Sequence, residues 1–326
     1  FITIDCRRAD HVGAYGYERP TTPSIDALFR DGVRFDHAYS NAPMTIPSLP
    51  QIFTSAVFPQ PSLATFVQPI AAAGIPNAAL VNNVWLVLWL ARANVPFDKL
   101  ISGGDYMAQK LTDDAVAWLK DHHDTRFALY LHYLDAHTPY RAPEGYAHMF
   151  ADPKYRGPVS DNFDDVDGAN SGRFDAADKQ RVLDLYDGQV RFIDDQIARL
   201  VAELKESGRL DRTVIVLSAD HGEELWDHGK FFHGQSLYDE LLHVPWMIRL
   251  PGGRVAMRVA QPVSLLDLAP TLLEMLGIEV PTGIQGRSVV PTLDERQEAP
   301  RAAIYAEKVA TVNPATGAPS SLKRAL

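Results

Sequence analysis

A short segment behind an apolar run carries the densest group of residues in this chain that could do chemistry. Asp220, His221 and Gly222 directly follow the run 213–218, which has the composition of a buried strand. Carboxylates and imidazoles at a strand end are common metal ligands and common acid–base groups. The next residues add Glu223, Glu224, Asp227, His228, Lys230 and His233. For His228 and Lys230 the sequence favours a solvated loop with no part in the chemistry.

The first residues of the chain predict a second strand, 1–5, which also ends in a carboxylate, Asp5. In an open α/β sheet, ligands gather at the carboxyl ends of the strands. Asp5, Asp220 and His221 are therefore expected to meet in one metal site, although most of the chain separates them. Their mixed oxygen and nitrogen donors favour zinc or manganese as the divalent ion; an all-oxygen set would have favoured calcium or magnesium.

A hydroxyl in a proline-rich segment, Thr45 in 41–50, is the candidate nucleophile. Pro47 follows it at a position typical of the first turn of a helix. A hydroxyl at a helix N-terminus lies among free N–H groups and near the positive end of the helix dipole. That environment favours both an alkoxide and an oxyanion. Local sequence alone nevertheless favours a plainer interpretation, in which Thr45 only caps the helix.

A third strand end, after 127–133, carries two further groups that could act on a substrate. Asp135 and His137 follow this strand, and two histidines and one aspartate, His132, Asp135 and His137, could together hold a metal or a substrate oxyanion. For His137 a plain surface position is equally compatible with the sequence. His132 lies within the strand itself and is predicted to be structural.

The scaffold that must position these residues is predicted from the order of the elements. Strand-like apolar runs alternate with helical patterns, which indicates an α/β fold with a central, mostly parallel sheet flanked by helices. Strands are expected at 1–5, 78–81, 127–133, 213–218 and 244–250, and helices at 22–32, 107–120, 176–206 and 265–276. Residues 152–173 predict a mobile surface loop. A catalytic domain is expected over 1–250 and a smaller C-terminal subdomain over 251–326.

Composition excludes several classes of protein. The chain has 326 residues, 46% hydrophobic, with a net charge of -10 and no basic run, so no nucleic-acid partner is expected. A single cysteine excludes an intramolecular disulfide. The longest apolar stretch, about 78–90, is broken by Asn82 and Asn83 and is too short to span a bilayer. Membrane association is expected only through residues upstream of Phe1; the compartment, cytoplasmic or extracytoplasmic, and homo-oligomerisation stay open.

Taken in order, these segments resemble the sulfatase family of the alkaline phosphatase superfamily. The matching segments are 4–11, 15–17, 22–28, 32–35, 38–40, 135–140, 186–187, 218–223, 233–234, 243–245 and 266–273. The resemblance implies that Asp5, Asp220 and His221 bind a divalent metal ion. It also implies that Thr45 is the nucleophile and faces the ion. His137 and His233 would then hold the anionic oxygens of a small ester substrate or assist its leaving group.

One departure from the family pattern, in the nucleophile motif, narrows the expected chemistry. Sulfatases carry Cys or Ser in a Cys/Ser-x-Pro-x-Arg motif and oxidise it to formylglycine, whereas this chain has Thr45 in that place and Leu49 in place of the Arg. Threonine cannot form formylglycine, and many sulfatases have Lys where this chain has His233. The pattern therefore resembles enzymes of phosphate or phosphonate esters more than those of sulfate esters. A membrane-linked phospho-group transferase and a catalytically dead binding protein stay open.

The other departure concerns the number and kind of metal ligands. Cys6 stands where many sulfatases have another metal-binding Asp, and we expect it to be a packed, unliganded thiol. A second ion held by Asp135, His137 and His233, as in two-metal phosphodiesterases, is a further alternative, although one ion is enough for the transfer.

Overall fold

The computed structural model describes residues 1–59, 63–103, 107–253, 256–294, 303–308 and 323–325. Within them a central sheet contains β1 (Ile2–Ile4), β2 (Val33–Phe35), β4 (Asn77–Val81), β5 (Lys99–Ile101), β6 (Ala128–Tyr133), β7 (Ile215–Ala219), β11 (Trp246–Arg249) and β12 (Met257–Val259). Their spatial order is β12-β2-β11-β7-β1-β6-β4-β5. The strands run parallel to their neighbours except at β11, which is antiparallel to both β2 and β7. The predicted α/β class with a mostly parallel sheet is confirmed.

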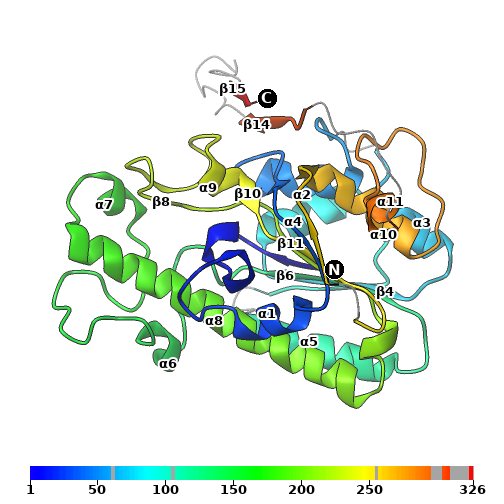
Figure 1. Cartoon of the computed structure of the whole chain (residues 1–326), viewed down its shortest axis with the longest axis horizontal. Helices are drawn as coiled ribbons and strands as arrows, with labels where there is room; N and C mark the ends of the chain where they lie inside the picture. Colours follow the sequence, from blue (N-terminus) through cyan, green and yellow to red (C-terminus); the bar gives the residue numbers. More distant parts are fainter. Residues whose placement is uncertain (60–62, 104–106, 254–255, 295–302, 309–322, 326) are drawn as a thin grey trace.

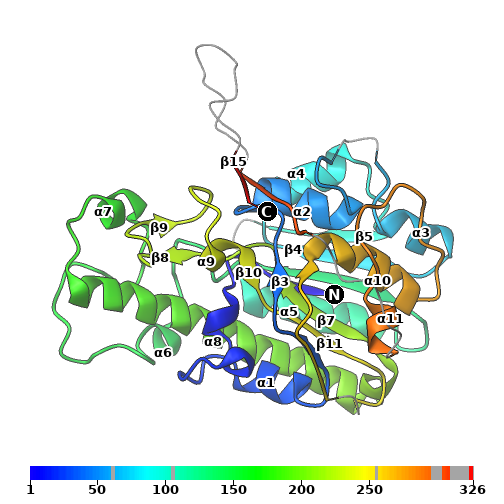
Figure 2. The same ribbon diagram turned by 45° about the horizontal axis from the view of Figure 1, so that its top comes forward.

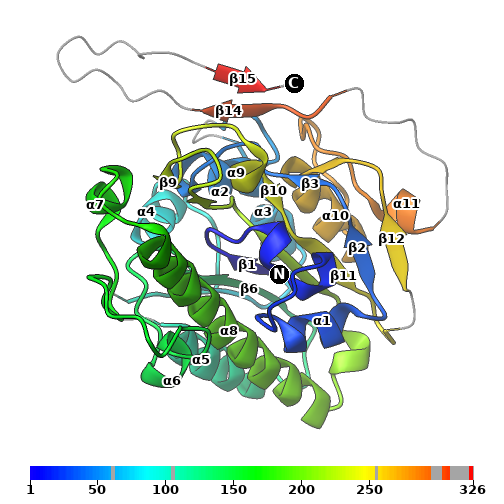
Figure 3. The same cartoon turned by 60° about the vertical axis from the view of Figure 1, so that its left-hand side comes forward.

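Short strands outside this sheet form three smaller sheets. These strands are β3 (Ala38–Tyr39), β10 (His243–Val244) and β13 (Val263–Ser264) in one sheet, β8 (Glu224–Leu225) with β9 (Phe231–Phe232), and β14 (Ala306–Lys308) with β15 (Lys323–Ala325). Figure 3 shows β14 and β15 lying at the top of the view, outside the helices and the central sheet.

Helices cover both faces of the central sheet. They are α1 (Pro23–Phe29), α2 (Thr45–Thr54), α3 (Val67–Ala72), α4 (Val84–Arg92), α5 (Ala108–Asp121), α6 (Glu144–Ala147), α7 (Val166–Asn170), α8 (Ala176–Glu206), α9 (Asp239–Leu242), α10 (Leu268–Met275) and α11 (Val290–Leu293). Four 3-10 turns accompany them: η1 (Ala9–His11), η2 (Gly13–Tyr15), η3 (Leu210–Arg212) and η4 (Leu265–Asp267). Figures 1 and 2 show α8, α5 and α1 on one side of the sheet, and α2, α4 and α10 on the other.

The buried strands contribute side chains alternately to two hydrophobic cores, one on each face of the central sheet. Ile2 and Ile4 of β1 pack into the core under α8, while Val216 of β7 packs into the core that contains α2 and α10. Because successive strand residues point to opposite faces, a strand covered on both sides is apolar throughout. The predicted runs 1–5 and 213–218 are therefore central strands, each ending at the edge where β1, β6 and β7 finish.

The long helix α8 shows why its sequence signal was so clear. The Asp175 side chain accepts hydrogen bonds from the backbone N–H groups of Ala177 and Asp178, which closes a capping box. Gly208 follows the helix with a φ of +67°, a conformation that favours glycine. The bounds Ala176–Glu206 agree with the predicted helix over 176–206.

Three expected elements differ from the structure. The expected strand 244–250 is divided into β10 and β11 at Pro245, which has no N–H to continue the ladder. The expected helix 265–276 begins as the 3-10 turn η4 before α10. The segment 152–173 is not loop throughout, because it contains α7, whose N-terminus is capped by the Asp165 carboxylate accepting from Gly168 N.

The expected C-terminal subdomain shares the central sheet with the rest of the chain. After residue 250, β12 extends the sheet beside β2, and Leu268 and Leu273 of α10 join the core that contains Phe53. The division at residue 250 stays a prediction, and part of 251–326 lies outside the described residues. Among the described helices, none has the length and apolar character needed to cross a membrane.

Candidate functional site

Four neighbouring strands bring polar side chains to one edge of the sheet. β7, β1, β6 and β4 lie side by side, and β1 is parallel to both β6 and β7. Asp220, Asp5 and Asn83 follow the carboxyl ends of β7, β1 and β4. Because parallel strands end at the same edge, residues far apart in sequence meet there.

The predicted metal ligands Asp5, Asp220 and His221 lie together at this edge. One ligand atom from each lies within 4.8 Å of the others, and all three side chains are fully buried. Asp220 Oδ2 has no hydrogen-bond partner among the described residues. Two buried carboxylates without a paired cation are costly, and this arrangement fits a divalent cation.

The acid–base state of these residues follows from burial and from their neighbours. Burial would raise the pKa of Asp5, but the hydrogen bond from His132 and the nearby imidazoles hold it below the usual range. Burial, and then the charge of Asp5, raises the pKa of Asp220. Burial lowers the pKa of His221 to about 4, which keeps its imidazole neutral, the form that binds metals.

Hydrogen bonding determines which nitrogen of His221 is available. Its Nδ1 lies 2.8 Å from the carbonyl oxygen of Gly222, and a carbonyl can only accept, so Nδ1 carries the proton. Nε2 is therefore the free nitrogen, and it faces Asp5 Oδ1 at 3.4 Å and Asp220 Oδ2 at 3.5 Å. Glycine is needed at 222 because a Cβ there would lie 2.0 Å from the Glu240 carbonyl oxygen.

Thr45 is the first residue of α2, and its hydroxyl faces the carboxylate cluster. Thr45 Oγ lies 3.1 Å from His221 Nε2 and 3.4 Å from Asp5 Oδ2. The N-cap position belongs to Met44, and no side chain caps this helix. The interpretation of Thr45 as a plain N-cap is therefore wrong, because its hydroxyl points to the cluster and not to the helix backbone.

Other residues of the segment 40–49 hold the start of α2 near the end of β7. Ser40 Oγ and Ser48 Oγ both donate to the carbonyl oxygen of Asp220, at 2.5 and 2.6 Å. Leu49, which replaces the arginine of the sulfatase motif, is fully buried in the core that contains α10. Residue 49 therefore stabilises the fold in this chain and supplies no positive charge to the site.

His233 reaches the cluster from the strand-end loop, supported by Glu223. The His233 ring centroid lies 4.6 Å from that of His221, and its Nδ1 lies 3.0 Å from Glu223 Oε1. Burial lowers the pKa of His233 to about 3 and raises that of Glu223 to about 7. His137 completes the group, because its ring centroid lies 4.9 Å from that of His233.

Asp135 does not join these histidines. Both of its carboxylate oxygens accept from the backbone N–H of Ala108, at 3.0 and 3.1 Å, at the start of α5. Among the described residues, Asp135, His137 and His233 form no group with ligand atoms close enough to hold a metal. The placement of these three residues therefore does not support a second ion between them, because the Asp135 carboxylate is bonded to the N-terminus of α5.

Two residues beside Asp5 were missed as parts of the site. Asn83 Nδ2 donates to Asp5 Oδ2 at 3.1 Å, while its Oδ1 caps α4. His132, inside β6 as expected, lies with Nε2 3.2 Å from the same oxygen and with Nδ1 2.8 Å from Thr3 Oγ1. From the sequence, Asn83 is interpreted only as an interruption of the apolar stretch 78–90. Its place directly behind a strand that ends at the same edge was the signal that could have found it.

His228 and Lys230 lie farther from this chemistry, as the solvated-loop interpretation predicts. Lys230 is exposed. The His228 ring is half exposed, stacks on Tyr238 and lies 2.6 Å from a Glu240 oxygen. Neither residue shares a donor group with Asp5, Asp220 and His221.

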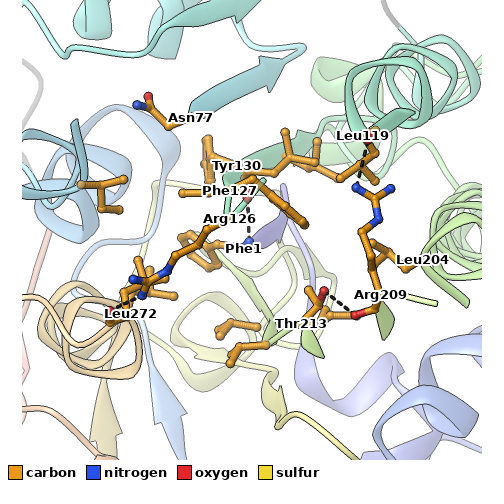
Figure 4. A pocket seen from close by; sticks show the side chains of 18 of the residues that line it. Phe1, Asn77, Leu119, Arg126, Phe127, Tyr130, Leu204, Arg209, Thr213 and Leu272 are labelled. Carbon is orange, nitrogen blue, oxygen red and sulfur yellow. Dashed lines mark hydrogen bonds between the residues drawn. The ribbon is translucent and has the colours of Figure 1, made fainter. Parts of the chain in front are cut away.

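A cavity of about 620 Å³ lies at the opposite edge of the sheet. Its walls come from the beginnings of β1, β6 and β7, with Phe127, Leu204 and Leu272 among the lining residues that Figure 4 shows. None of the predicted site residues lines this cavity. The open space and the titratable cluster are therefore separate features of the molecule.

Comparison with known proteins agrees with this arrangement. The profile of the Sulfatase family matches residues 1–278. The uncharacterized sulfatase YidJ of Escherichia coli is 24% identical over 357 residues, which cover 91% of this chain and 71% of YidJ. Human arylsulfatase K is 30% identical over 125 residues, so the match spans 38% of this chain and only 23% of that protein.

A solved structure shows the same fold. The phosphonate monoester hydrolase SpPMH from Silicibacter pomeroyi superposes with a TM-score of 0.75 at 23% identity, covering 96% of this chain and 80% of that one. At this identity the likeness shows the fold alone, whereas the family profile spans most of the chain. The chain belongs to the sulfatase family of the alkaline phosphatase superfamily.

Proposed function

We propose that this chain is a metal-dependent hydrolase of small anionic esters, with Thr45 as its nucleophile. The observation that carries the proposal is the position of Thr45 Oγ, 3.1 Å from His221 Nε2 and 3.4 Å from Asp5 Oδ2. A hydroxyl at the start of a buried helix, turned toward a cluster of metal-ligand side chains, has the surroundings of an activated nucleophile. Family membership supports ester hydrolysis as the reaction class.

Asp5, Asp220 and His221 would hold the ion, and Thr45 would face it. Members of the superfamily generally use a divalent metal, and the mixed oxygen and nitrogen donors favour zinc or manganese. When bound, such an ion supplies positive charge that lowers the pKa of a hydroxyl and offsets the negative charge of an ester. Asn83 and His132 orient Asp5, since both bond to its Oδ2.

The chain's own residues account for the transfer. Thr45 Oγ releases its proton to solvent and forms a bond to the phosphorus or sulfur atom while the bond to the leaving alcohol breaks on the opposite side. The leaving oxygen takes up a proton, and His137 and His233 steady the charged oxygens or deliver that proton. Water then cleaves the ester on Thr45 and restores the hydroxyl. Transfer to another alcohol instead of water would make the protein a phospho-group transferase.

Phosphate or phosphonate esters are the proposed substrates, in preference to sulfate esters. Threonine cannot become formylglycine, and the position of the motif arginine is a buried core leucine, Leu49. The fold of SpPMH, named as a phosphonate monoester hydrolase, is compatible with this preference.

The test combines metal analysis with trapping of the covalent ester. Purified protein should contain a stoichiometric divalent ion and should hydrolyse p-nitrophenyl phosphate or phosphonate faster than the sulfate. Acid quenching during turnover, followed by peptide mass spectrometry, should find the added group on Thr45. Thr54→Ala is the matched control, because Thr54 lies on the same helix and bonds only to the Pro50 carbonyl. Efficient aryl sulfate hydrolysis that Thr45→Ala abolishes would overturn the substrate preference, and full turnover in Thr45→Ala would overturn Thr45 as the nucleophile. A protein that is inactive on every ester and stays ion-free at saturating zinc and manganese would favour a non-catalytic binding protein.

A further inference from the structure

We propose that Cys6 is a sulfur ligand of the ion held at the carboxyl edge of the sheet, and that it makes the site select zinc over manganese, magnesium and calcium. This inference rests on the proposed function only in needing an ion at Asp5, Asp220 and His221. It replaces the sequence-based expectation of a packed, unliganded thiol.

The backbone at Cys6 turns two consecutive side chains toward the same place. Along an extended strand, Asp5 and Cys6 would point to opposite faces of the sheet. Cys6 instead has a φ of +56°, a left-handed conformation that is uncommon for residues other than glycine. The Tyr186 hydroxyl holds this turn by donating to the Cys6 carbonyl at 2.9 Å and accepting from Arg8 N at 3.3 Å. As a result, Cys6 Sγ lies 3.2 Å from Asp5 Oδ1.

The surroundings of the sulfur are those of a ligand rather than of a core thiol. A buried, unreactive cysteine packs among apolar side chains. Cys6 Sγ is fully buried, yet it lies 3.5 Å from His233 Nδ1 in addition to its contact with Asp5. Donor atoms of Cys6, His221 and His233 all lie within 4.8 Å of one another. The sulfur therefore faces imidazole and carboxylate groups at the site where the ion is proposed to bind.

The Cys6 group and the carboxylate group have His221 in common, and the proposal assigns both groups to one ion. Only Nε2 of His221 has a lone pair to offer, since Nδ1 donates to the Gly222 carbonyl, and one nitrogen lone pair binds one ion. The buried Asp220 Oδ2, which has no hydrogen-bond partner in the described part of the chain, lies 3.5 Å from that Nε2 and independently points to a ligand at the same place. His233 keeps its proposed role toward the substrate, because its Nδ1 is bonded to Glu223.

Sulfur ligation has a direct consequence for metal choice. The thiol loses its proton to solvent as the sulfur–metal bond forms, and no electron is transferred. Magnesium and calcium bind oxygen ligands, whereas thiolate ligands select softer ions such as zinc. A set of two carboxylates, one imidazole and one thiolate therefore favours zinc more strongly than Asp5, Asp220 and His221 alone.

Cobalt(II), a spectroscopic substitute for zinc, tests this ligand without relying on activity. Cys6 is the single cysteine in the sequence, so sulfur-to-cobalt charge-transfer absorption in the near ultraviolet can come from no other residue. The protein, kept reduced with a phosphine, should show this absorption together with the visible bands of bound cobalt. Cys6→Ser should keep the visible bands and lose the charge-transfer absorption.

Competition between ions tests the proposed selectivity. Cys6→Ser should lower zinc affinity by at least about tenfold, the loss that even an outer partner of a zinc ligand causes. Its magnesium affinity should stay unchanged, because the oxygen donors remain. Thermal unfolding of the metal-free proteins should show that both are folded.

The outcomes separate this inference from the proposed function. Bound cobalt with no sulfur absorption in the unmodified protein would overturn the role of Cys6 and leave the metal-dependent hydrolase intact. Equal zinc affinity in the protein and in Cys6→Ser would overturn it as well. If neither protein binds cobalt or zinc, the ion itself is absent and the proposed function fails with it.

Discussion

The carboxyl edge of the central sheet holds a cluster of carboxylate and imidazole groups, whereas the amino edge borders a cavity. At the carboxyl edge, Asp5, Asp220 and His221 are fully buried with a ligand atom of each within 4.8 Å of the others. At the amino edge, a cavity of about 620 Å³ is lined mostly by apolar side chains such as Phe127 and Leu204. None of the residues Asp5, Asp220 and His221 lines that cavity.

The two edges differ in the kind of buried polar group that they hold. At the amino edge, Arg209 donates to the Leu119 carbonyl at 2.9 Å and Arg126 donates to the Leu276 carbonyl. At the carboxyl edge, Asp220 Oδ2 and Glu223 Oε2 are buried without partners among the described residues. Buried polar atoms without partners are costly, so they mark a place where a ligand completes the structure. Grouped carboxylates and imidazoles therefore mark the candidate site in this fold, and the cavity of about 620 Å³ does not coincide with it.

Replacing the proposed nucleophile should give the largest fall in turnover of all the substitutions considered. Thr45→Ala removes the only group proposed to bond to the substrate, so turnover of a phosphate or phosphonate ester should fall by about 10⁴-fold or more. Steady-state kinetics would measure the loss, and Thr54→Ala should remain close to the unmodified protein. Retention of full turnover by Thr45→Ala would remove the carboxyl edge as the site of covalent chemistry.

Loss of His233 should reduce turnover by an intermediate amount. Its effect on metal content should distinguish residues that contact the substrate from residues that bind the metal. His233→Ala should reduce turnover by about 10²–10³-fold, the scale of one lost oxyanion donor, while metal content stays unchanged. Substrates with poor leaving groups should suffer most if His233 also delivers a proton. Asp220→Asn is the contrast, since it should lower metal affinity. If His233→Ala lost metal as fully as Asp220→Asn, His233 would be a ligand of the ion and not a group that only steadies the substrate.

A substitution at the amino edge should change stability and leave the chemistry alone. Leu200 lines the cavity and is buried in the core under α8, so Leu200→Ala should cost about 2–4 kcal/mol in the free energy of unfolding. Turnover per folded molecule should not change. Leu88→Ala, at a position that is 51% exposed, is the matched control and should cost much less. A large fall in turnover for Leu200→Ala would show that the cavity takes part in function.

Buried acids away from the site should affect folding alone. Asp194 on α8 accepts from Ser24 N and Ile25 N at 3.0 and 2.8 Å, and burial raises its pKa from 3.8 to about 6. Because the folded pKa lies above the unfolded value, this group's contribution is full below pH 3.8 and is lost as the pH rises toward 6.

The expected loss is on the order of 2–3 kcal/mol between those two pH values. Urea unfolding of the protein and of Asp194→Asn at several pH values in this range would measure the loss. The two proteins should differ in the slope of the free energy of unfolding against pH. Asn at 194 should abolish that part of the pH dependence, at the cost of one hydrogen bond, about 1 kcal/mol. Identical slopes in the two proteins would contradict the assignment to Asp194.

The sequence by itself determined the α/β class, the strand ends that carry Asp5 and Asp220, and the long helix over 176–206. These features depend on short-range signals, namely apolar runs, helical spacing and capping residues, that survive without knowledge of neighbours. The ordered motifs also led to the family, because each was readable along the chain. Roles inferred from that resemblance, for Thr45, His137 and His233, stay predictions.

Tertiary structure alone decided which polar groups face one another. Local sequence favoured Thr45 as a cap, but α2 is bonded to the Asp220 carbonyl through Ser48, and the Thr45 hydroxyl lies 3.1 Å from His221 Nε2. Asp135 sits behind a strand end as Asp5 does, yet it bonds to the start of α5. Asn83 became part of the site because β4 lies beside β6, which lies beside β1. Such outcomes depend on strand order and helix packing between distant segments, and no local pattern encodes them.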